Sequence, residues 1–300
     1  MKHIMTGKVK EVYQVDEETL EFAYTDNISV FDKIIPSKVP HKGETLCRTA
    51  KYWFDILSEN GIHNHYLSEP SKDRMRVKRV DIIRDYDSID GNTVNYLIPL
   101  EIICRHYVAG SLLDRVKAGK ITAEQLGFSK DHEVKYGEKL PRPFMEATTK
   151  LEEHDMNLTD AEAKKMAGLS DAEYGEIMDA VLKIDAIIDR EVAKRGLIHC
   201  DGKKEFGYDK NRKLMVLDTF GTLDEDRWWD AAEYAKGNIV ELSKEFVRQH
   251  YRETGYHKAL MDARDSGSKE PDIPALPQDI IDRVGKLYID MYERLTGERF

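Results

Sequence analysis

The sequence predicts an α+β fold with antiparallel sheets. Two observations support this: the first part of the chain reads as strands with one helix inserted, whereas the second half is richer in helix. A chain of 300 residues is long enough to bury a sizeable core, as one large domain or two smaller ones. We expect an antiparallel N-terminal lobe over residues 1–96 and an α+β C-terminal lobe over residues 97–300.

The N-terminal elements follow from the spacing of apolar residues. Residues 8–15 and 19–25 alternate between apolar and polar side chains on either side of an acidic turn, which is typical of paired strands. Residues 43–59 carry apolar side chains at helical spacing, and Gly61 follows as a stop signal. Basic, strand-like runs are expected at 75–84 and 94–106.

Helical patterns dominate the second half. Ser170 and Glu173 have the spacing of a capping box, and the amphipathic pattern that follows them ends at Gly196. The elements expected after it are two strands within 197–219, helices over 239–254 and 278–296, and a surface loop with Pro and Gly at 262–279.

The charge balance excludes one class of function. The net charge is −10, so no surplus of Lys and Arg exists to neutralise a nucleic-acid backbone. A nucleotide substrate is compatible with this balance, because a local basic pocket within an acidic protein is sufficient to bind it.

Cysteine usage and the apolar runs indicate a cytoplasmic protein. Cys47, Cys104 and Cys200 lie far apart without metal-ligand spacing, so we expect reduced, half-buried thiols. No run approaches the roughly 20 apolar residues of a membrane span. The N-terminus leads into strand-like alternation rather than a signal peptide. The sequence leaves the oligomeric state open, with a homo-oligomer among the options.

The most informative stretch is a predicted hairpin at 199–219. If its turn is centred on Asn211 and Arg212, Glu205 faces Asp218 with Cβ atoms about 4.5–5.5 Å apart. Two facing carboxylates repel each other, and a hard divalent cation with oxygen ligands would neutralise them. The alternative is a solvated hairpin face, since a register slip of one residue breaks the pairing. Strand alternation also predicts a shared face for three charged residues: Asp201, Lys203 and Glu205.

Several other segments could bind an anion. Gly7 stands beside two lysines, Lys8 and Lys10, whose point charges suit a nucleotide phosphate, although an exposed turn is the alternative. The apolar run 96–105 could offer backbone groups to a base, or it is a buried strand with solvated ends. Gly110 and Ser111 form a turn into a helix, a common anion site. Weaker candidates, each with a local structural alternative, are Lys150, the His154–Asp155 pair, and Arg227.

In their order along the chain, these segments resemble the SAICAR synthetase family from end to end. The stretches that carry the resemblance are GKVKEVY (7–13), TDNISVFD (25–32), IPSKVPHKGETLCRTAKYWF (35–54), LIPLEIICRHYVAGS (97–111), FMEATTKLEEHDMN (144–157), GLIHCDGKKEFG (196–207) and LDTFGTLDEDRWW (217–229). The pattern over 245–297 is similar to that of the longer members of the family.

The resemblance implies a two-lobed fold related to the ATP-binding lobes of kinases and ATP-grasp enzymes. It implies a ligase of purine biosynthesis that converts ATP, the carboxylated imidazole ribonucleotide CAIR and L-aspartate to ADP, phosphate and SAICAR. ATP would be a co-substrate and Mg²⁺ a cofactor, and the partners would be these small molecules.

The resemblance also implies roles for individual residues. The ATP-binding set would be Gly7, Lys8, Lys10, Leu97, Glu101 and Lys150. The substrate-binding set would be Arg105, Ser111 and Arg227 around the ribonucleotide phosphate, and Asp26, Ser29 and Asp32 near the incoming amine. The catalytic set would be Lys203, Asp155 and Lys150, and the metal ligands would be Glu205 and Asp218.

Three positions depart from the family pattern. Asn27 stands where an Arg is usual, Thr219 replaces an acid after Asp218, and residues 221–226 read GTLDED in place of a Thr-Pro-Asp-Ser type of turn. Asn27 removes a positive charge where a carboxylate or the amino acid is expected. The alternatives are therefore a paralogous ligase of the same fold with another amine or carboxylate, or a kinase-like phosphotransferase or non-catalytic nucleotide-binding protein.

Overall fold

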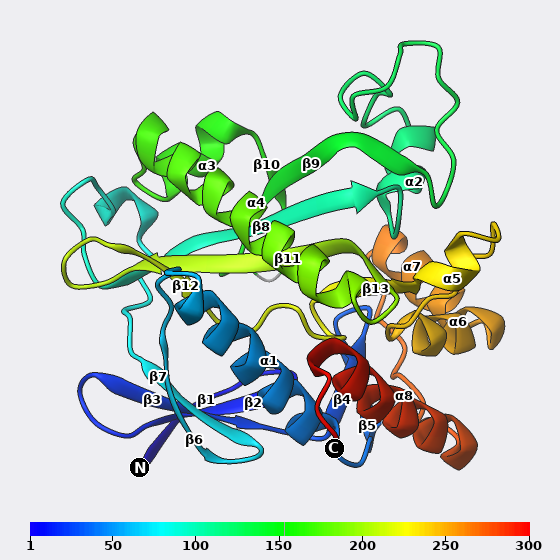
Figure 1. Ribbon diagram of the computed structural model, residues 1–300. Coiled ribbons are helices and arrows are strands. Elements are labelled where there is room, and N and C mark those ends of the chain that lie inside the picture. The colour runs from blue at the N-terminus through cyan, green and yellow to red at the C-terminus, as the bar shows by residue number, and fades with distance from the viewer. Residues whose placement is uncertain (153) are drawn as a thin grey trace. The chain divides into compact units, whose positions relative to one another are not determined.

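The computed structural model describes residues 1–152 and 154–300, and it divides into two compact units, each built from separate stretches of chain (Figure 1). Unit 1 comprises Met1–Tyr52, Tyr66–Val77 and Glu241–Phe300, and unit 2 comprises Trp53–His65 and Lys78–Val240. This division differs from the expected boundary at residue 96. The physical reason is that the C-terminal helices pack with the N-terminal strands and helix of unit 1.

Unit 1 contains a five-stranded sheet in the order β1–β2–β3–β7–β6. Its strands are β1 (Lys2–Thr6), β2 (Lys10–Gln14), β3 (Thr19–Tyr24), β6 (Tyr66–Ser71) and β7 (Arg74–Lys78). The antiparallel pairing of β2 with β3 confirms the strands predicted at 8–15 and 19–25. A separate hairpin joins β4 (Asn27–Val30) to β5 (Lys33–Lys38) through Phe31 and Asp32, which both have positive φ.

Four helices contribute to unit 1. The predicted helix at 43–59 is confirmed as α1 (Lys42–Glu59), whose first part lies in unit 1, and α8 (Gln278–Thr296) confirms the prediction at 278–296. Rings of α8 lie over cations of α1: Lys42 Nζ is 5.2 Å from the ring centroid of Tyr288, and the Arg48 guanidinium is 4.3 Å from that of Tyr292.

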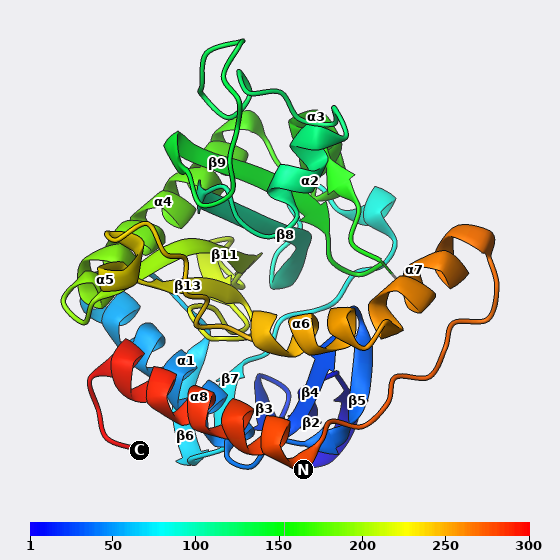
Figure 2. The ribbon, with the colours of Figure 1, turned by 90° about the vertical axis from the view of Figure 1, so that its right-hand side faces the viewer.

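The remaining helices differ from prediction. The helix expected from residue 239 begins only at Glu245 (α6, Glu245–Glu253). The prediction of a loop over 262–279 is wrong for its first residues, because helix α7 (Tyr256–Ser266) extends into this range. The helix is flanked by Gly255 and Gly267, which both have the left-handed conformation. Figure 2 shows α7 followed by the long connection to α8. Residues of this region are tied to the β4–β5 hairpin, since Arg264 donates to the Phe31 carbonyl at 3.0 Å.

Unit 2 contains a sheet in the order β10–β9–β8–β11–β12, with β13 also paired to β11. The strands are β8 (Tyr96–Tyr107), β9 (Lys139–Thr149), β10 (Asn157–Leu158), β11 (Leu197–Tyr208), β12 (Leu214–Leu217) and β13 (Asp226–Asp230). The helices are α2 (Leu112–Lys117), α3 (Asp160–Met166), α4 (Asp171–Ala193), α5 (Ala231–Tyr234) and a short 3₁₀ turn at Tyr86–Ser88. Helix α4 begins with the predicted capping box of Ser170 and Glu173, and it crosses one face of the sheet (Figure 1).

The hairpin of β11 and β12 exists, but its predicted register is wrong by one residue. Glu205 faces Leu217 rather than Asp218. The connection is a longer loop in which the Asp209 carboxylate accepts the backbone N–H groups of Asn211 and Lys213 at 2.8 and 2.9 Å. Asp218 falls just beyond β12, with φ of +54°.

Two further expectations concern environment. Within the described residues, none of the helices has both the length and the apolar character needed to cross a bilayer. Cys47, Cys104 and Cys200 are free thiols as predicted, but they are fully buried rather than half-buried.

Candidate active site

The centre of the candidate site is Lys203, on the face of β11 away from α4. Its Nζ lies 2.7 Å from the Glu101 carboxylate of β8, 3.5 Å from Glu205 and 3.2 Å from Glu225. The contact between Lys203 and Glu205 confirms the predicted shared face, because residues two apart on a strand point the same way. These carboxylates raise the pKa of Lys203 against the opposing effect of burial, so the lysine stays charged.

A second cation, Lys150, follows the end of β9. It forms an ion pair with Glu205 and lies 3.7 Å from Glu101. Burial lowers the pKa of Lys150, but the negative charges of Glu205 and Asp218 raise it by more, so the net shift is upward. Lys150 thus interacts with both proposed metal ligands, although Glu205 and Asp218 are not cross-strand partners.

Among these carboxyl groups, Glu101 has a pKa that departs clearly from its ordinary value. Burial raises its pKa to about 7, and the negative charge of Glu205 adds to this, whereas Lys203 and Lys150 lower it. The raised pKa therefore reflects the burial of this carboxyl group more than the negative charge around it. The carboxylates of Glu101, Glu205, Glu225 and Asp218 outnumber the two lysines.

An arginine cluster lies at the far end of β11 and β8. Arg105 binds Asp201 at 2.8 Å and Glu146 at 3.0 Å. Arg227 of β13 also binds Asp201, and Arg115 of α2 binds Glu146. Guanidinium groups from three elements therefore converge at this end of the sheet, and guanidinium groups suit the binding of a phosphate. Burial raises the pKa of Asp201, but Arg227 and Arg105 lower it to a net value below the ordinary one.

Local backbone geometry makes room for this cluster. Gly110 has φ of +57°, and a Cβ built on it would lie 2.6 Å from the Arg227 guanidinium. Ser111 follows as the N-cap residue of α2, as the predicted turn into a helix requires. Its side chain is exposed and makes no capping hydrogen bond.

Two other predicted residues of unit 2 lie nearby in the chain. Leu97 is buried in a core with Met215 and Leu217, so its side chain is a packing residue of β8. Asp155 is exposed in the connection between β9 and β10. That connection is closed by Thr149, which exchanges hydrogen bonds with Met156 at 3.0 Å.

The candidates in unit 1 form their own contacts. The Gly7 N–H donates to the Lys10 carbonyl at 2.8 Å, which closes the turn between β1 and β2. Lys8 forms an exposed ion pair with Asp32 at 2.5 Å. Lys10 lies over the Phe22 ring at 4.5 Å. Ser29 is buried in the β4–β5 hairpin.

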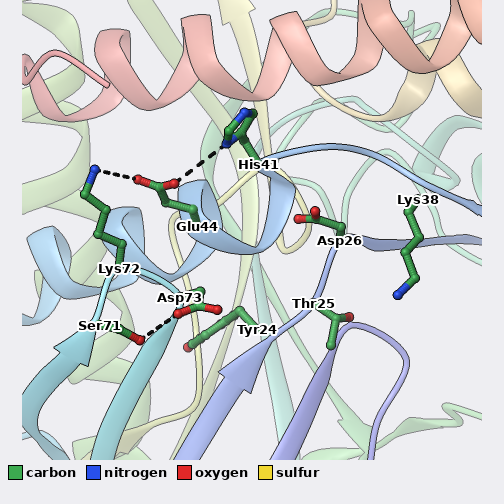
Figure 3. Close-up of a pocket in the computed structure, with 9 residues that line it drawn as sticks. All are labelled: Tyr24, Thr25, Asp26, Lys38, His41, Glu44, Ser71, Lys72 and Asp73. Carbon is green, nitrogen blue, oxygen red and sulfur yellow. Dashed lines mark hydrogen bonds and ion pairs between the residues drawn. The ribbon is translucent and has the colours of Figure 1, made fainter.

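Asp26 lines a cavity of roughly 570 Å³ in unit 1. Figure 3 shows its walls, which come from the end of β3, the start of α1, β5 and the β6–β7 turn. Most of the charges drawn there are engaged within the protein: Glu44 binds Lys72 at 3.3 Å, and Asp73 accepts the Ser71 hydroxyl at 2.6 Å. The Asp26 carboxylate accepts the Gly43 N–H at 3.0 Å, which stabilises the first turn of α1.

Sequence reasoning missed Glu225 and a buried group behind the sheet that includes Lys204. Glu225 lies in segment 221–226, which departs from the family pattern, but this departure does not show which residues Glu225 contacts. Lys204 had a clearer signal, because Lys203 and Lys204 are adjacent in a strand and must point to opposite faces.

Comparison with known proteins places the chain in a family. The family model described as SAICAR synthetase matches residues 3–263. Proteins named phosphoribosylaminoimidazole-succinocarboxamide synthase from Thermoplasma acidophilum and Thermoplasma volcanium are 51% and 50% identical to it over 300 residues, which is 100% of each chain.

Solved structures of SAICAR synthetases have a similar fold. The SAICAR-synthase from Saccharomyces cerevisiae complexed with SAICAR is 27% identical, with a TM-score of 0.75 over 99% of this chain and 95% of that one. A SAICAR synthetase in complex with ADP is 26% identical, with a TM-score of 0.71 over 99% and 98% of the two chains. The predicted α+β fold is confirmed by these matches. Fold and relatives define a carbon–nitrogen ligase. The chain belongs to the SAICAR synthetase family.

Proposed function

We propose that the chain catalyses the ATP-dependent joining of CAIR and L-aspartate to give ADP, phosphate and SAICAR. The observation that carries this proposal is the juxtaposition, on one sheet of unit 2, of the Lys150–Lys203 acid cluster with the cluster of Arg105, Arg115 and Arg227. The first suits a metal and a transferring phosphoryl group, and the second suits a ribonucleotide phosphate. The relatives and solved structures named above, which include complexes with SAICAR and with ADP, support it.

The chemistry requires an activated carboxylate. A carboxylate is a poor acyl donor because its leaving group would be oxide, whereas an acyl phosphate has phosphate as its leaving group. Transfer of the γ-phosphoryl group to the CAIR carboxylate therefore precedes attack by the amine. The protein mainly needs to hold the two reacting groups together and to neutralise charge on the phosphoryl group.

Six residues are assigned to the nucleotide. Gly7, Lys8 and Lys10 would bind the ATP phosphates, with Lys150 as a further phosphate ligand. Leu97 and Glu101 belong to the strand segment that lies beside adenine in this assignment. Lys150 is charged and held by carboxylates, so it would be presented to the phosphates without rearrangement of the strands.

Glu205 and Asp218 would hold Mg²⁺. Carboxylate oxygens, which Mg²⁺ prefers as ligands, are present there, because Glu205 contacts both lysines and the charge of Asp218 raises the pKa of Lys150. When bound, the metal would neutralise phosphoryl oxygens of the nucleotide. Lys150 would then turn from Glu205 to the phosphates.

The ribonucleotide would bind with its phosphate at Arg105, Ser111 and Arg227. Lys203 would hold the imidazole carboxylate that becomes phosphorylated, since its ammonium group is charged and lies 3.5 Å from Glu205, a proposed metal ligand. Asp155, together with Asp26, Ser29 and Asp32, is assigned to the incoming amine. Asn27 lies within this last group, so the identity of the amino acid depends on it most.

One assay tests the proposal. The protein is incubated with ATP, Mg²⁺ and CAIR, with and without L-aspartate, and ADP and the succinocarboxamide are measured. We expect ADP release that depends on both substrates. Release with CAIR that occurs only with a different amine would assign a paralogous ligase, and release independent of CAIR would overturn the ligase proposal.

A further inference from the structure

A buried ionic cluster lies on the opposite face of β11, between the sheet and α4. Lys204 has no exposed surface, forms an ion pair with Asp185 of α4, and lies 3.5 Å from Asp226 at the start of β13. His199 Nε2 donates to Asp226 at 2.7 Å, and His106 Nε2 donates to Asp185 at 2.9 Å. These five residues are the buried ionic cluster, and the ligase chemistry uses none of them.

The cluster brings cationic and anionic groups together. Burial raises the pKa of Asp185, but Lys204 and His106 lower it well below its ordinary value. Burial lowers the pKa of His199, but Asp185 and Asp226 raise it to a net value above the ordinary one. Lys204 lies between the same two carboxylates. Removing one partner of such a group leaves a buried charge uncompensated, which is more costly than replacing the whole group.

The cluster is a poor metal site, although Cys104, His106 and Asp185 place ligand atoms within 4.8 Å of one another. Asp185 already binds the Lys204 ammonium group, which occupies the position that a cation would need. Burial raises the pKa of the Cys104 thiol far above neutrality when no metal is bound.

Asp226 connects the cluster to the active site. Its second carboxylate oxygen accepts the Gly221 N–H at 2.8 Å, while the Gly221 carbonyl accepts Trp53 Nε1–H at 2.9 Å. The loop at 218–225 is thereby pinned at its middle. A Cβ at Gly202 would lie 1.9 Å from the Asp226 carboxylate, so Asp226 packs directly on β11. Arg227 follows Asp226 in the chain, and Asp218 and Glu225 lie in the pinned loop.

We propose that the buried ionic cluster is a positioning device, in which Asp226 holds the 218–225 loop and Arg227 in register with β11. Asp226 and Lys204 are positioning residues, because they act through the residues that they hold. The assignment of those residues to ribonucleotide and metal rests on the proposed function.

The test uses the full-length chain and three variants. Asp226→Ala removes the hydrogen bonds that Asp226 accepts from His199 and from the Gly221 N–H. Asp226→Asn retains the shape of the side chain and an acceptor for Gly221, but it removes the charge. Glu173→Gln is the matched control, because it removes a part-buried ion pair with Arg212 in the same unit, without contact to the 218–227 segment. Amide hydrogen exchange and steady-state kinetics are measured for each.

We expect Asp226→Ala to raise exchange in the 218–227 peptide well beyond any increase in the β9 peptide. With a displaced Arg227, kcat/KM for CAIR should fall by about 10- to 100-fold. Asp226→Asn should show the same pattern to a smaller extent. Glu173→Gln should lower the thermal midpoint while leaving the KM for CAIR unchanged.

The amide hydrogen exchange measurement tests the positioning role even if CAIR proves not to be the substrate. Exchange that rises equally in the 218–227 and β9 peptides would reduce the cluster to general stability and overturn the proposal. An unchanged KM for CAIR in an active, folded Asp226→Asn variant with altered exchange would also overturn it. If Asp226→Ala does not fold, Asp226→Asn provides both measurements.

Discussion

At the level of single residues, the candidate site consists of charged groups that meet in two clusters. In the acid cluster, Lys203 contacts Glu101, Glu205 and Glu225, and Lys150 also contacts the first two of these carboxylates. In the arginine cluster, three guanidinium groups converge on Asp201 and Glu146. Partly buried charge is costly to maintain, so these two clusters are where bound ions and substrates would stabilise the protein.

The metal assignment predicts a specific loss. Glu205→Gln and Asp218→Asn should each lower turnover at saturating ATP by at least about a hundredfold, because each removes a ligand from the ion that neutralises the phosphoryl group. The thermal midpoint should change little. Turnover is measured over a titration of Mg²⁺, with unfolding followed in parallel.

Glu225→Gln is the matched control for this prediction. It removes a carboxylate that contacts Lys203 at 3.2 Å but is not assigned to the metal. The apparent affinity for Mg²⁺ should therefore stay at the wild-type value in this variant. Normal turnover in both Glu205→Gln and Asp218→Asn would show that the metal is held elsewhere.

Glu101 predicts a dependence of stability on pH. Its pKa is about 7 in the folded protein, raised mainly by burial, against about 4.5 as the reference value. Between these values the folded state binds the proton that the unfolded state has released. The free energy of unfolding should therefore fall as pH rises from about 4.5 to 7, by up to about 3 kcal/mol, and then level off.

The measurement is chemical denaturation of the ligand-free, Mg²⁺-free protein, compared with Glu101→Gln at each pH. The difference between the two proteins isolates the carboxyl group. A wild-type advantage that grows with pH would mean that Lys203 and Lys150 outweigh burial at Glu101.

At the level of elements, structure that depends on neighbouring residues could be predicted, whereas the register between paired strands could not. Helix α4 was predictable because its capping box and apolar stripe are both local. The β11–β12 hairpin was predictable as a hairpin, but its register depended on the Asp209 side chain, which widens the loop. Helix α7 was missed because only Tyr256 and Leu260 are buried on it, too few to show a period.

The same limit applies to the site. Lys203 and Glu205 could be placed on one face because strand alternation is local. The partners of the buried ionic cluster come from β8, α4, β11 and β13, so no spacing in the sequence relates them. Glu225 was likewise invisible, since a loop position acquires its neighbours only when Asp226 pins the loop.

One element-level prediction concerns the turn before α2. Gly110→Ala should raise the KM for the ribonucleotide by about tenfold or more, because the residue has positive φ and a Cβ would meet the Arg227 guanidinium at 2.6 Å. Gly119→Ala is the matched control: its φ is +69°, but nothing lies within 4 Å of a Cβ there.

Both variants carry the same backbone strain, so both should lose comparable stability. Only Gly110→Ala should weaken binding, measured by steady-state kinetics and by calorimetric titration of the ribonucleotide. Equal binding by the two variants would remove Arg227 from the phosphate site.

At the level of the whole molecule, the last part of the chain completes the first. Residues 241–300 belong to unit 1, where α8 covers α1 with buried aromatic and aliphatic side chains. A prediction made along the chain assigns these helices to the second lobe, because sequence neighbours are usually spatial neighbours. The actual arrangement means that unit 1, with the proposed phosphate lysines, lacks its full core until the C-terminal helix is in place.

This arrangement predicts where a core mutation in α8 is felt. Tyr288 is 1% exposed and lies over Lys42, so Tyr288→Ala should lower the free energy of unfolding by about 3–5 kcal/mol. Amide exchange should rise most in β2, β3 and the first half of α1, and less in β9 of unit 2. Lys286→Ala, an exposed position on the same helix with a surface ion pair to Asp290, should cost less than about 1 kcal/mol. Equal increases in the strands of both units after Tyr288→Ala would show that the units unfold as one, because loss of the α8 core would then open the sheet of unit 2 to the same extent.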